Sequence, residues 1–429
     1  MIAQLAVLLG VMLAAILVGV PVFLGMALAA AIYGVAFMGK LPPFIVGQTF
    51  VQGIDSYSFC AIPFFFLAGE IMNVGGISRR LLRLARALIG HVRGGLSHVN
   101  ILACMVFSGV SGSAAADASA VGAVLIPAMK SEGYPAGYAA AVTAAASTMG
   151  PIIPPSIPLV VFGLVAGTSI GKLFVGGVVP GLLMGAFLLV ASYLISRVRR
   201  YPAAEWLGFG EIASAAGEAV LALLMPIIVV GGLVGGVATA TEIGAVAVVY
   251  AVLVSVVVYR EATLAQLWAA VRKAAIDSCA ILVIAAVVGV FTWIVASLGV
   301  GHSLAAWIGG ITRDPTMVLA VICVVLLVAG MVLEPVTMLL VLIPLMVPVA
   351  TAVGIDLTHF GVVVVLATLI GLVTPPVGFL IYLCAAQAEA TVASVVRELM
   401  PFVLALVLLL AAVVLFPGLV LWLPRLMAA

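Results

Sequence analysis

Charged side chains are scarce in this chain of 429 residues: Lys, Arg, Asp and Glu make up only 7% of it, whereas 66% of its residues are hydrophobic. A soluble domain carries about 25% charged residues, because they cover the surface that faces water. With a mean hydropathy of +1.44, the composition excludes soluble enzymes, nucleic-acid binders, disordered chains and disulfide-rich scaffolds. It predicts a polytopic membrane protein.

Cysteine and histidine are also scarce and scattered. Five cysteines lie singly in apolar runs, and four histidines lie near the ends of apolar segments, without the spacing of a metal site. The sequence has no nucleophile–base pair, phosphate-binding loop or nucleotide motif. We therefore expect no enzymatic activity, no transition metal and no cofactor. We expect the cysteines to be small buried hydrophobic residues, and they are Cys60, Cys104, Cys279, Cys323 and Cys384.

Ten apolar segments have the length of about 20 residues that a hydrocarbon core of about 30 Å requires. They are predicted to be helices, because an open strand leaves its backbone polar groups unsatisfied in lipid. The predicted spans are 2–19, 22–39, 55–75, 141–165, 173–196, 219–237, 242–259, 276–298, 360–384 and 399–421. The first is interpreted as a retained span and not a signal peptide, because no basic residue precedes it.

Two further apolar stretches, 96–129 and 317–350, are too long for one span and are polar or interrupted by proline at their centres. This pattern is typical of a re-entrant helical hairpin, whose tip lies at membrane depth beside protein or a water-filled cavity. Two ordinary kinked helices are the alternative. Segments 77–93 and 261–275 combine basic residues with apolar residues at helical spacing, and they predict amphipathic arms that lie against lipid headgroups.

The basic residues are unevenly distributed between the loops. Placing segment 77–93 in the cytoplasm puts 13 of the 17 Lys and Arg residues on that side and leaves Lys40, Lys172, Arg313 and Arg425 outside. The positive-inside rule then puts the N-terminus outside. In this assignment no Lys or Arg lies at mid-span. An anionic substrate would therefore depend on helix dipoles, hydroxyl groups and bound cations.

The two halves of the chain carry matching residues at offsets of 217 and 221 positions. The matched pairs are Asp117 and Glu334, Pro127 and Pro344, Pro155 and Pro376, and Pro180 and Pro401. Because matched segments start on opposite sides of the membrane, the sequence predicts an inverted repeat, the architecture of secondary transporters. The first repeat, 1–217, comprises scaffold spans 1–75, arm 77–93, hairpin 96–129, broken helix 141–165 and span 173–196. The second, 218–429, comprises scaffold spans 219–259, arm 261–275, span 276–298, hairpin 317–350, broken helix 360–384 and last span 399–421.

One span of each repeat is broken by prolines, at 148–155 and at 374–376. Proline removes a backbone donor and clashes with the preceding turn, so it frees carbonyl groups near mid-membrane. Freed carbonyls suit a small cation such as Na⁺, and half-helix N-termini suit a carboxylate. A packing kink satisfied by a neighbouring Ser or Thr is the alternative, although it explains a matched pair poorly.

Hydroxyl groups alternate with glycines at the tip of the first hairpin, at Ser108, Ser111 and Ser113. Small residues let the backbone approach a ligand, and hydroxyls donate to carboxylate oxygens. Close helix packing through small residues is the alternative, and we expect both, with Ser111 and Ser113 at the ligand.

Two carboxylates lie within apolar hairpins, Asp117 in the first and Glu334 in the second. Intramembrane carboxylates are costly and are functional by default. Glu334 has an alternative role, since it could cap a half-helix that begins at Pro335. Glu70 and Glu242 lie nearer the ends of spans, where a structural role is equally well supported.

Several motifs together resemble the large membrane (M) subunit, DctM-like, of the tripartite ATP-independent periplasmic (TRAP) transporters. They are IPFFFLAGEIMNVGGISRRLL, FSGVSGSAAADASAVGAVLIPAMKSEGYP, TMGPIIPPSIPLVVFG, LEPVTMLLVLIPLMVP and LVTPPVGFLIY. The resemblance covers essentially the whole chain. It implies a multi-pass importer of the bacterial inner membrane with a periplasmic N-terminus, an elevator mechanism and Na⁺ as the coupling ion.

The resemblance also implies partners and a substrate class. A periplasmic binding protein would deliver an organic acid, such as a C4-dicarboxylate or a sialic or other sugar acid. A small four-helix membrane (Q) subunit would be a separate polypeptide, because the chain begins directly at the first M-like span. A stand-alone Na⁺/carboxylate symporter that needs no binding protein is the alternative, and a channel or a passive scaffold subunit is a further one. A channel would need a continuous polar path, and no ring of charged residues is evident.

Carried over to this chain, the resemblance places the ligands at the hairpin tips and broken helices. The implied Na⁺ positions are Ser111, Gly112, Ser113, Gly150, Pro151, Gly330, Val332 and Thr374, to which we add the intramembrane carboxylate Glu334. The implied substrate contacts are Ser111, Ser113, Asp117 and Ser156.

Overall fold

The computed structural model describes residues 2–39, 42–300, 303, 310 and 312–426. Every regular element in these ranges is a helix, and seven of the helices are long and apolar enough to cross a membrane. The expected all-α membrane architecture is therefore confirmed. Lys40, one of the basic residues expected outside, lies outside the described residues.

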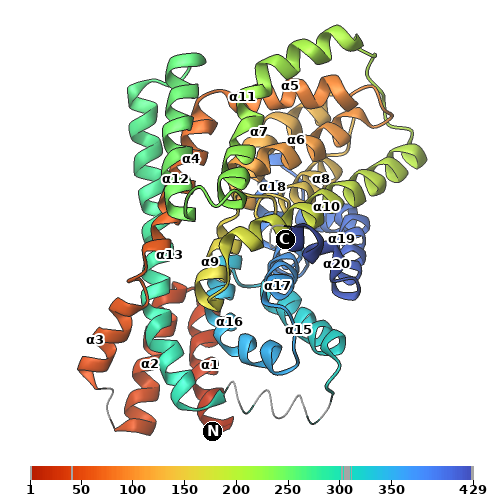
Figure 1. Ribbon diagram of the computed structural model, residues 1–429. Helices are drawn as coiled ribbons and strands as arrows, with labels where there is room; N and C mark the ends of the chain where they lie inside the picture. The colour runs from red at the N-terminus through yellow and green to blue at the C-terminus, as the bar shows by residue number, and fades with distance from the viewer. Residues whose placement is uncertain (1, 40–41, 301–302, 304–309, 311, 427–429) are drawn as a thin grey trace.

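One side of the molecule is built from helices of both repeats, among them the long α11 and α13 (Figure 1). They are α1 (Ile2–Leu17), α2 (Val22–Met38), α3 (Pro43–Gln52), α4 (Ala61–Val74) after the short turn η1 (Tyr57–Cys60), α11 (Gly208–Val234), α12 (Ala240–Val252) with its π-helical end η2 (Leu253–Val258), and α13 (Leu264–Ser297). Helix α4 packs against α12 and α13, and α13 also packs against α2 and α3. Glu242 belongs to a capping box with Thr239 at the start of α12, so it has the structural role considered for it.

The other side contains the hairpins and broken helices. In the first repeat these are α6 (Gly95–Ser111), α7 (Ala114–Ser131), α8 (Ala136–Ser147), α9 (Ile157–Ala166) and α10 (Ile170–Arg199). In the second they are α15 (Pro315–Gly330), α16 (Pro335–Ala352), α17 (Leu357–Gly371), α18 (Phe379–Ala388), α19 (Val392–Leu415) and α20 (Gly418–Leu426). Helix α6 packs on α7, and α15 packs on α16. Both long apolar stretches are therefore hairpins, as predicted, and Figure 1 shows them in opposite halves of the molecule.

The core lies between the hairpins. Nearly every residue of α8 and α17 is buried, from Gly137 to Ser147 and from Thr358 to Gly371. Alanine dominates α8 and valine is frequent in α17, and small side chains let neighbouring helices approach closely. Each of these half-helices ends just before its prolines; the first broken segment is almost entirely buried, whereas Pro376 and Val377 of the second are exposed.

Three sequence-based expectations differ from the structure. Residues 261–275 are not a separate arm, because the helix that starts at Leu264 runs without a break through the predicted span to Ser297. The last predicted span, 399–421, is divided where α19 ends at Leu415, just before Pro417. Cys60 and Cys279 are exposed, so the prediction that they are buried was wrong. The other three cysteines are buried, as predicted.

Helix α5 (Ile77–Ile89) leads into the first hairpin and is held by ion pairs. Arg79 and Arg80 each contact Glu261 at 2.7 Å. Arg83 contacts Glu211 at 2.8 Å and Glu218 of α11 at 2.5 Å. The hydrogen bond from Arg80 lowers the pKa of the Glu261 carboxyl group. The start of hairpin α6–α7 is thereby tied to α11 and to the loop before α13.

Candidate functional site

The tip of the first hairpin is a tight turn between two half-helices. Gly112 has a φ of 61°, which glycine adopts without the steric cost of a Cβ. A Cβ at this position would also lie 2.7 Å from the Pro155 carbonyl oxygen. Ser113 then caps α7, since its hydroxyl accepts a hydrogen bond from the Ala116 amide at 3.4 Å. The tip is therefore pressed directly against the first broken helix.

Asp117 lies in the first turn of α7 and is completely buried. Its carboxylate accepts hydrogen bonds from the Ser111 hydroxyl and, at 3.5 Å, from the Ser108 hydroxyl. A Cβ at Gly150 would lie 2.5 Å from one of its oxygens, so the broken helix covers this carboxylate. Asp117 thus orients Ser111 from behind the tip and does not line either of the cavities described below.

The tip of the second hairpin is closed by a carboxylate. Glu334 is the N-cap of α16 and accepts a hydrogen bond from the Thr337 amide at 3.1 Å. The capping role considered for Glu334 is therefore confirmed. Gly330 approaches Gly371 so closely that a Cβ on Gly371 would lie 2.6 Å from the Gly330 Cα atom. The Gly378 amide donates to the Met331 carbonyl at 3.1 Å, so the second tip is pressed against the second broken helix.

In each broken helix a Ser or Thr hydroxyl donates to a backbone carbonyl, as the alternative of a packing kink predicts. The Ser156 hydroxyl donates to the Pro151 carbonyl and accepts from the Leu159 amide at 3.2 Å, so it caps α9. The Thr374 hydroxyl donates to the Ile370 carbonyl at 2.6 Å. Each segment also contains one cis peptide bond, before Pro155 and before Pro376.

A small cavity of about 90 Å³ lies where the elements of both repeats converge. Its lining includes Gly112 and Ser113 of the first tip, Pro151 of the first broken helix, Glu334 of the second tip and Leu372 of the second broken helix. A water molecule occupies about 30 Å³ of liquid, so this space suits an ion or a few waters. Glu334 is the one ionisable residue in its lining.

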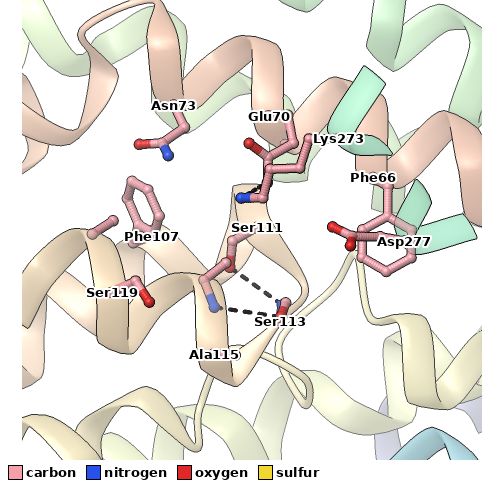
Figure 2. A pocket seen from close by; sticks show the side chains of 13 residues that line it. Phe66, Glu70, Asn73, Phe107, Ser111, Ser113, Ala115, Ser119, Lys273 and Asp277 are labelled. Atoms are coloured by element: carbon pink, nitrogen blue, oxygen red, sulfur yellow. Dashed lines mark hydrogen bonds and ion pairs between the residues drawn. The ribbon is translucent and has the colours of Figure 1, made fainter. Parts of the chain in front are cut away.

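A larger cavity of about 460 Å³ adjoins the first tip, and Figure 2 shows it from close by. Cavities of about 300–1,000 Å³ hold small organic ligands. One wall carries Ser111, Ser113 and Ser119 of the hairpin. The facing wall carries the charged residues Glu70 of α4 and Lys273 and Asp277 of α13; the lining also includes Phe66, Gly69, Asn73, Phe107, Ala115, Ala116 and Ala120.

Lys273 is the residue that sequence reasoning missed. Its Nζ atom lies 2.5 Å from Glu70 Oε1 in the cavity wall. Assigning it to a surface arm removed it from consideration, and the statement that no Lys or Arg lies at mid-span rests on that boundary. The continuous helix α13 carries Lys273 and Asp277 one turn apart on the same face, a spacing that is visible in the sequence.

The structure divides the predicted site residues into three groups. Ser111, Gly112, Ser113, Gly150 and Pro151 lie together around the first tip, with Asp117 behind it. The second tip and its broken helix contain Gly330, Glu334 and Thr374. Val332 also lies in the second tip, and it is 46% exposed. Ser156 is fully buried and lines neither cavity. Their roles in Na⁺ and substrate binding remain predictions.

Comparison with known proteins identifies relatives over nearly the whole chain. Residues 9–419 match the family described as "Tripartite ATP-independent periplasmic transporter, DctM component". The chain is 38% identical over 415 residues to the 2,3-diketo-L-gulonate TRAP transporter large permease protein YiaN of Escherichia coli, which covers 96% of this chain and 97% of that protein. It is 38% identical over 380 residues to the sialic acid TRAP transporter large permease protein SiaM of Vibrio cholerae, with coverage of 88% and 89%.

A solved structure confirms the fold. The YdaH transporter of Alcanivorax borkumensis superimposes with a TM-score of 0.64 over 87% of this chain and 88% of that one, at 15% sequence identity. At this identity the match supports the arrangement of helices alone.

Proposed function

The chain belongs to the DctM family of tripartite ATP-independent periplasmic (TRAP) transporters, and from this premise we propose that it imports an organic acid by Na⁺-coupled elevator transport across the bacterial inner membrane. Proteins of this family are permeases and not enzymes. The two relatives described above are named for 2,3-diketo-L-gulonate and sialic acid. Both compounds are sugar acids, so a carboxylate substrate is the proposal, with C4-dicarboxylates as a second class to test.

One observation supports this proposal above the others: both hairpin tips and both broken helices meet around a small cavity next to a larger one. Non-helical backbone at membrane depth is found where it lines a substrate or ion pathway. The Ser113 hydroxyl of the first tip accepts from the Ala116 amide and keeps its proton for a carboxylate oxygen, whereas the Ser111 hydroxyl already donates to Asp117. Backbone carbonyls of the broken segments supply the hard oxygen ligands that a small cation requires.

We assign Na⁺ to two places in this arrangement. The first is the contact between the first tip and the first broken helix, which brings Ser111, Gly112, Ser113, Gly150 and Pro151 together. The second is the contact between the second tip and the second broken helix, at Gly330, Val332, Glu334 and Thr374. The substrate lies between Ser111 and Ser113 and the facing wall, with Asp117 orienting Ser111 and Ser156 holding the start of α9.

The elevator step follows from the division of the molecule into long helices and hairpins. The hairpins and broken helices would move together as the carrier of substrate and Na⁺. The helices α4, α11, α12 and α13 would remain fixed, with the small Q subunit as a separate polypeptide beside them. In this orientation the N-terminus and the binding protein lie on the periplasmic side, and the arginines of α5 lie in the cytoplasm near anionic lipid.

Uptake into proteoliposomes tests the proposed function. Vesicles would contain this chain and its small-subunit partner, with labelled sialic acid, 2,3-diketo-L-gulonate or succinate outside, and an inward Na⁺ gradient would be imposed or omitted. We expect uptake that needs both the gradient and the cognate binding protein. Na⁺-driven uptake without the binding protein would instead identify a stand-alone symporter. Uptake that runs down the substrate gradient alone and does not saturate would identify a channel.

A further inference from the structure

We propose that Lys273 of α13 binds the carboxylate group of the transported acid in the larger cavity, and that Glu70 is the internal carboxylate which the substrate displaces. This inference rests on the proposed function, because it names the cationic group at the same site. It adds an ion-pair exchange between the protein and its substrate to the hydroxyl contacts described above.

The Lys273–Glu70 pair is placed to exchange partners. The Lys273 side chain is 56% exposed, whereas the Glu70 side chain is 13% exposed and packs into the wall. An ammonium group has three protons to donate, and the one interaction found for Lys273 is with Glu70. Figure 2 shows the Lys273 ammonium between Glu70 and the turn that carries Ser111 and Ser113. A carboxylate that enters the cavity therefore meets the ammonium on one side and the Ser113 hydroxyl on the other.

Neither hairpin offers the acid a helix N-terminus that lacks a neighbouring carboxylate. A helix N-terminus attracts an anion through its dipole, but the first turn of α7 already contains Asp117 and the start of α16 is capped by Glu334. The N-termini of both hairpin half-helices are thus compensated by a carboxylate of the protein, and the N-termini of α9 and α18, which have none, lie at the smaller cavity and not at the larger one. Among the described residues that line the two cavities at the tips, Lys273 is the single cationic side chain, so it is the side chain that can select a charged acid over a neutral sugar.

The charges on the facing wall also keep the substrate weakly bound. Glu70 and Asp277 contribute two negative charges and Lys273 one positive charge. When a substrate carboxylate pairs with Lys273, Glu70 loses its ion-pair partner. The net gain in binding free energy is therefore small. The exchange therefore favours acids without holding them tightly, as release into the adjoining compartment requires.

The first arm of the test measures the charge of the cavity and needs no substrate. A cysteine at Ser119 would be labelled in a Cys60→Ala, Cys279→Ala background with an anionic and with a cationic methanethiosulfonate reagent. Because charge pairs at exposed sites are coupled modestly, we expect Lys273→Gln to lower the anionic-to-cationic rate ratio about two- to fivefold. Glu70→Gln should raise this ratio by a similar factor. The matched control is Lys130→Gln, which removes a lysine that contacts Glu389 at 3.6 Å and lines neither cavity.

The second arm measures transport, with the wild-type chain assayed first for counterflow of labelled sialic acid, 2,3-diketo-L-gulonate and succinate. For an acid that the wild type carries, we expect Lys273→Gln to raise the apparent KM about two- to fivefold, Glu70→Gln to lower it, and Lys273→Arg to restore it. If Lys273→Gln fails to fold, Glu70→Gln still tests the proposal through the opposite shift.

The two arms separate the possible failures. An unchanged labelling ratio in Lys273→Gln, or an equal rise in KM for Glu70→Gln and Lys273→Gln, would show a purely structural ion pair and overturn the inference. If the wild type carries none of the acids while the labelling ratios shift as expected, the proposed substrate class fails. Lys273 then still sets the charge of the cavity, but its assignment as the carboxylate-binding group is overturned for these acids.

Discussion

Replacing Gly371 with alanine tests the close contact between the second hairpin and its broken helix. A Cβ at this position would lie 2.6 Å from the Gly330 Cα atom and 2.7 Å from its carbonyl carbon. These are backbone atoms, so they cannot rotate away as a flexible side chain would. Overpacking of this kind costs about 1–3 kcal/mol, while alanine in a helix gains about 0.5–1 kcal/mol over glycine. We therefore expect Gly371→Ala to lose about 1–2 kcal/mol of stability.

The assay is thermal unfolding of the purified protein in detergent, followed by tryptophan fluorescence with and without Na⁺. An unfolding entropy of about 2.1 cal/mol/K per residue, taken over the 429 residues of the chain, makes one kcal/mol correspond to about 1 °C, so a drop of about 1–2 °C is expected. Na⁺ should also stabilise the variant less than the wild type, because the proposed second Na⁺ site depends on the contact of Gly330 with the end of α17. Gly217→Ala on α11 is the matched control, since a Cβ there meets nothing within 4 Å. A variant at 371 that melts at or above the wild-type temperature would refute the reasoning.

Three further predictions concern the two hairpins and the ion pairs of α5. Asp117→Ala should abolish uptake while size-exclusion behaviour and melting stay near those of the wild type, since the buried carboxylate orients Ser111; normal uptake would remove Asp117 from the site. The hydrogen bond from Arg80 lowers the pKa of Glu261 below its ordinary value of 4.5, so its contribution to stability is present above that pH and is lost as the pH falls through the lowered value. Glu261→Gln should therefore reduce the difference in melting temperature between pH 6 and pH 3.5, and an unchanged difference would contradict this role. Cysteines at Ser111 and at Met338 should change their accessibility in opposite directions between inward- and outward-facing conditions, whereas static labelling of both would argue against an elevator.

The spans and hairpins could be predicted because lipid leaves few alternatives. A stretch of about 20 apolar residues must be a helix, and a longer stretch with a polar centre must fold back. Helices α2 (Val22–Met38) and α10 (Ile170–Arg199) follow the predicted spans 22–39 and 173–196 closely, whereas α11 and α13 begin more than ten residues before the predicted starts at 219 and 276. Helix caps could also be predicted: Glu334 before Pro335 marks a helix start in the sequence and caps α16 in the structure.

The facing wall of the larger cavity could not be derived in the same way. Periodicity in 261–275 describes an amphipathic helix equally well whether it ends at the interface or continues into the membrane. The difference depends on what its polar side meets, and Lys273 meets Glu70, 203 positions earlier in the chain. The exposure of Cys60 and Cys279 has the same origin, because an apolar run does not reveal which of its faces packs against the rest of the protein.

The distribution of charge between the two cavities gives them different chemistry. Among the described residues, the smaller one has a single ionisable residue in its lining, Glu334, whose carboxylate also caps α16, and no cationic group beside it, so it suits a cation. The larger one also has a net charge of −1, from Glu70, Asp277 and Lys273, but its lysine gives an acid a cationic partner next to Ser113. Ser113 lines both cavities, so a cation on one side of the first tip and a carboxylate on the other would attract each other across this residue. Occupation of one cavity would then raise the affinity of the other, which is the linkage that coupled transport requires.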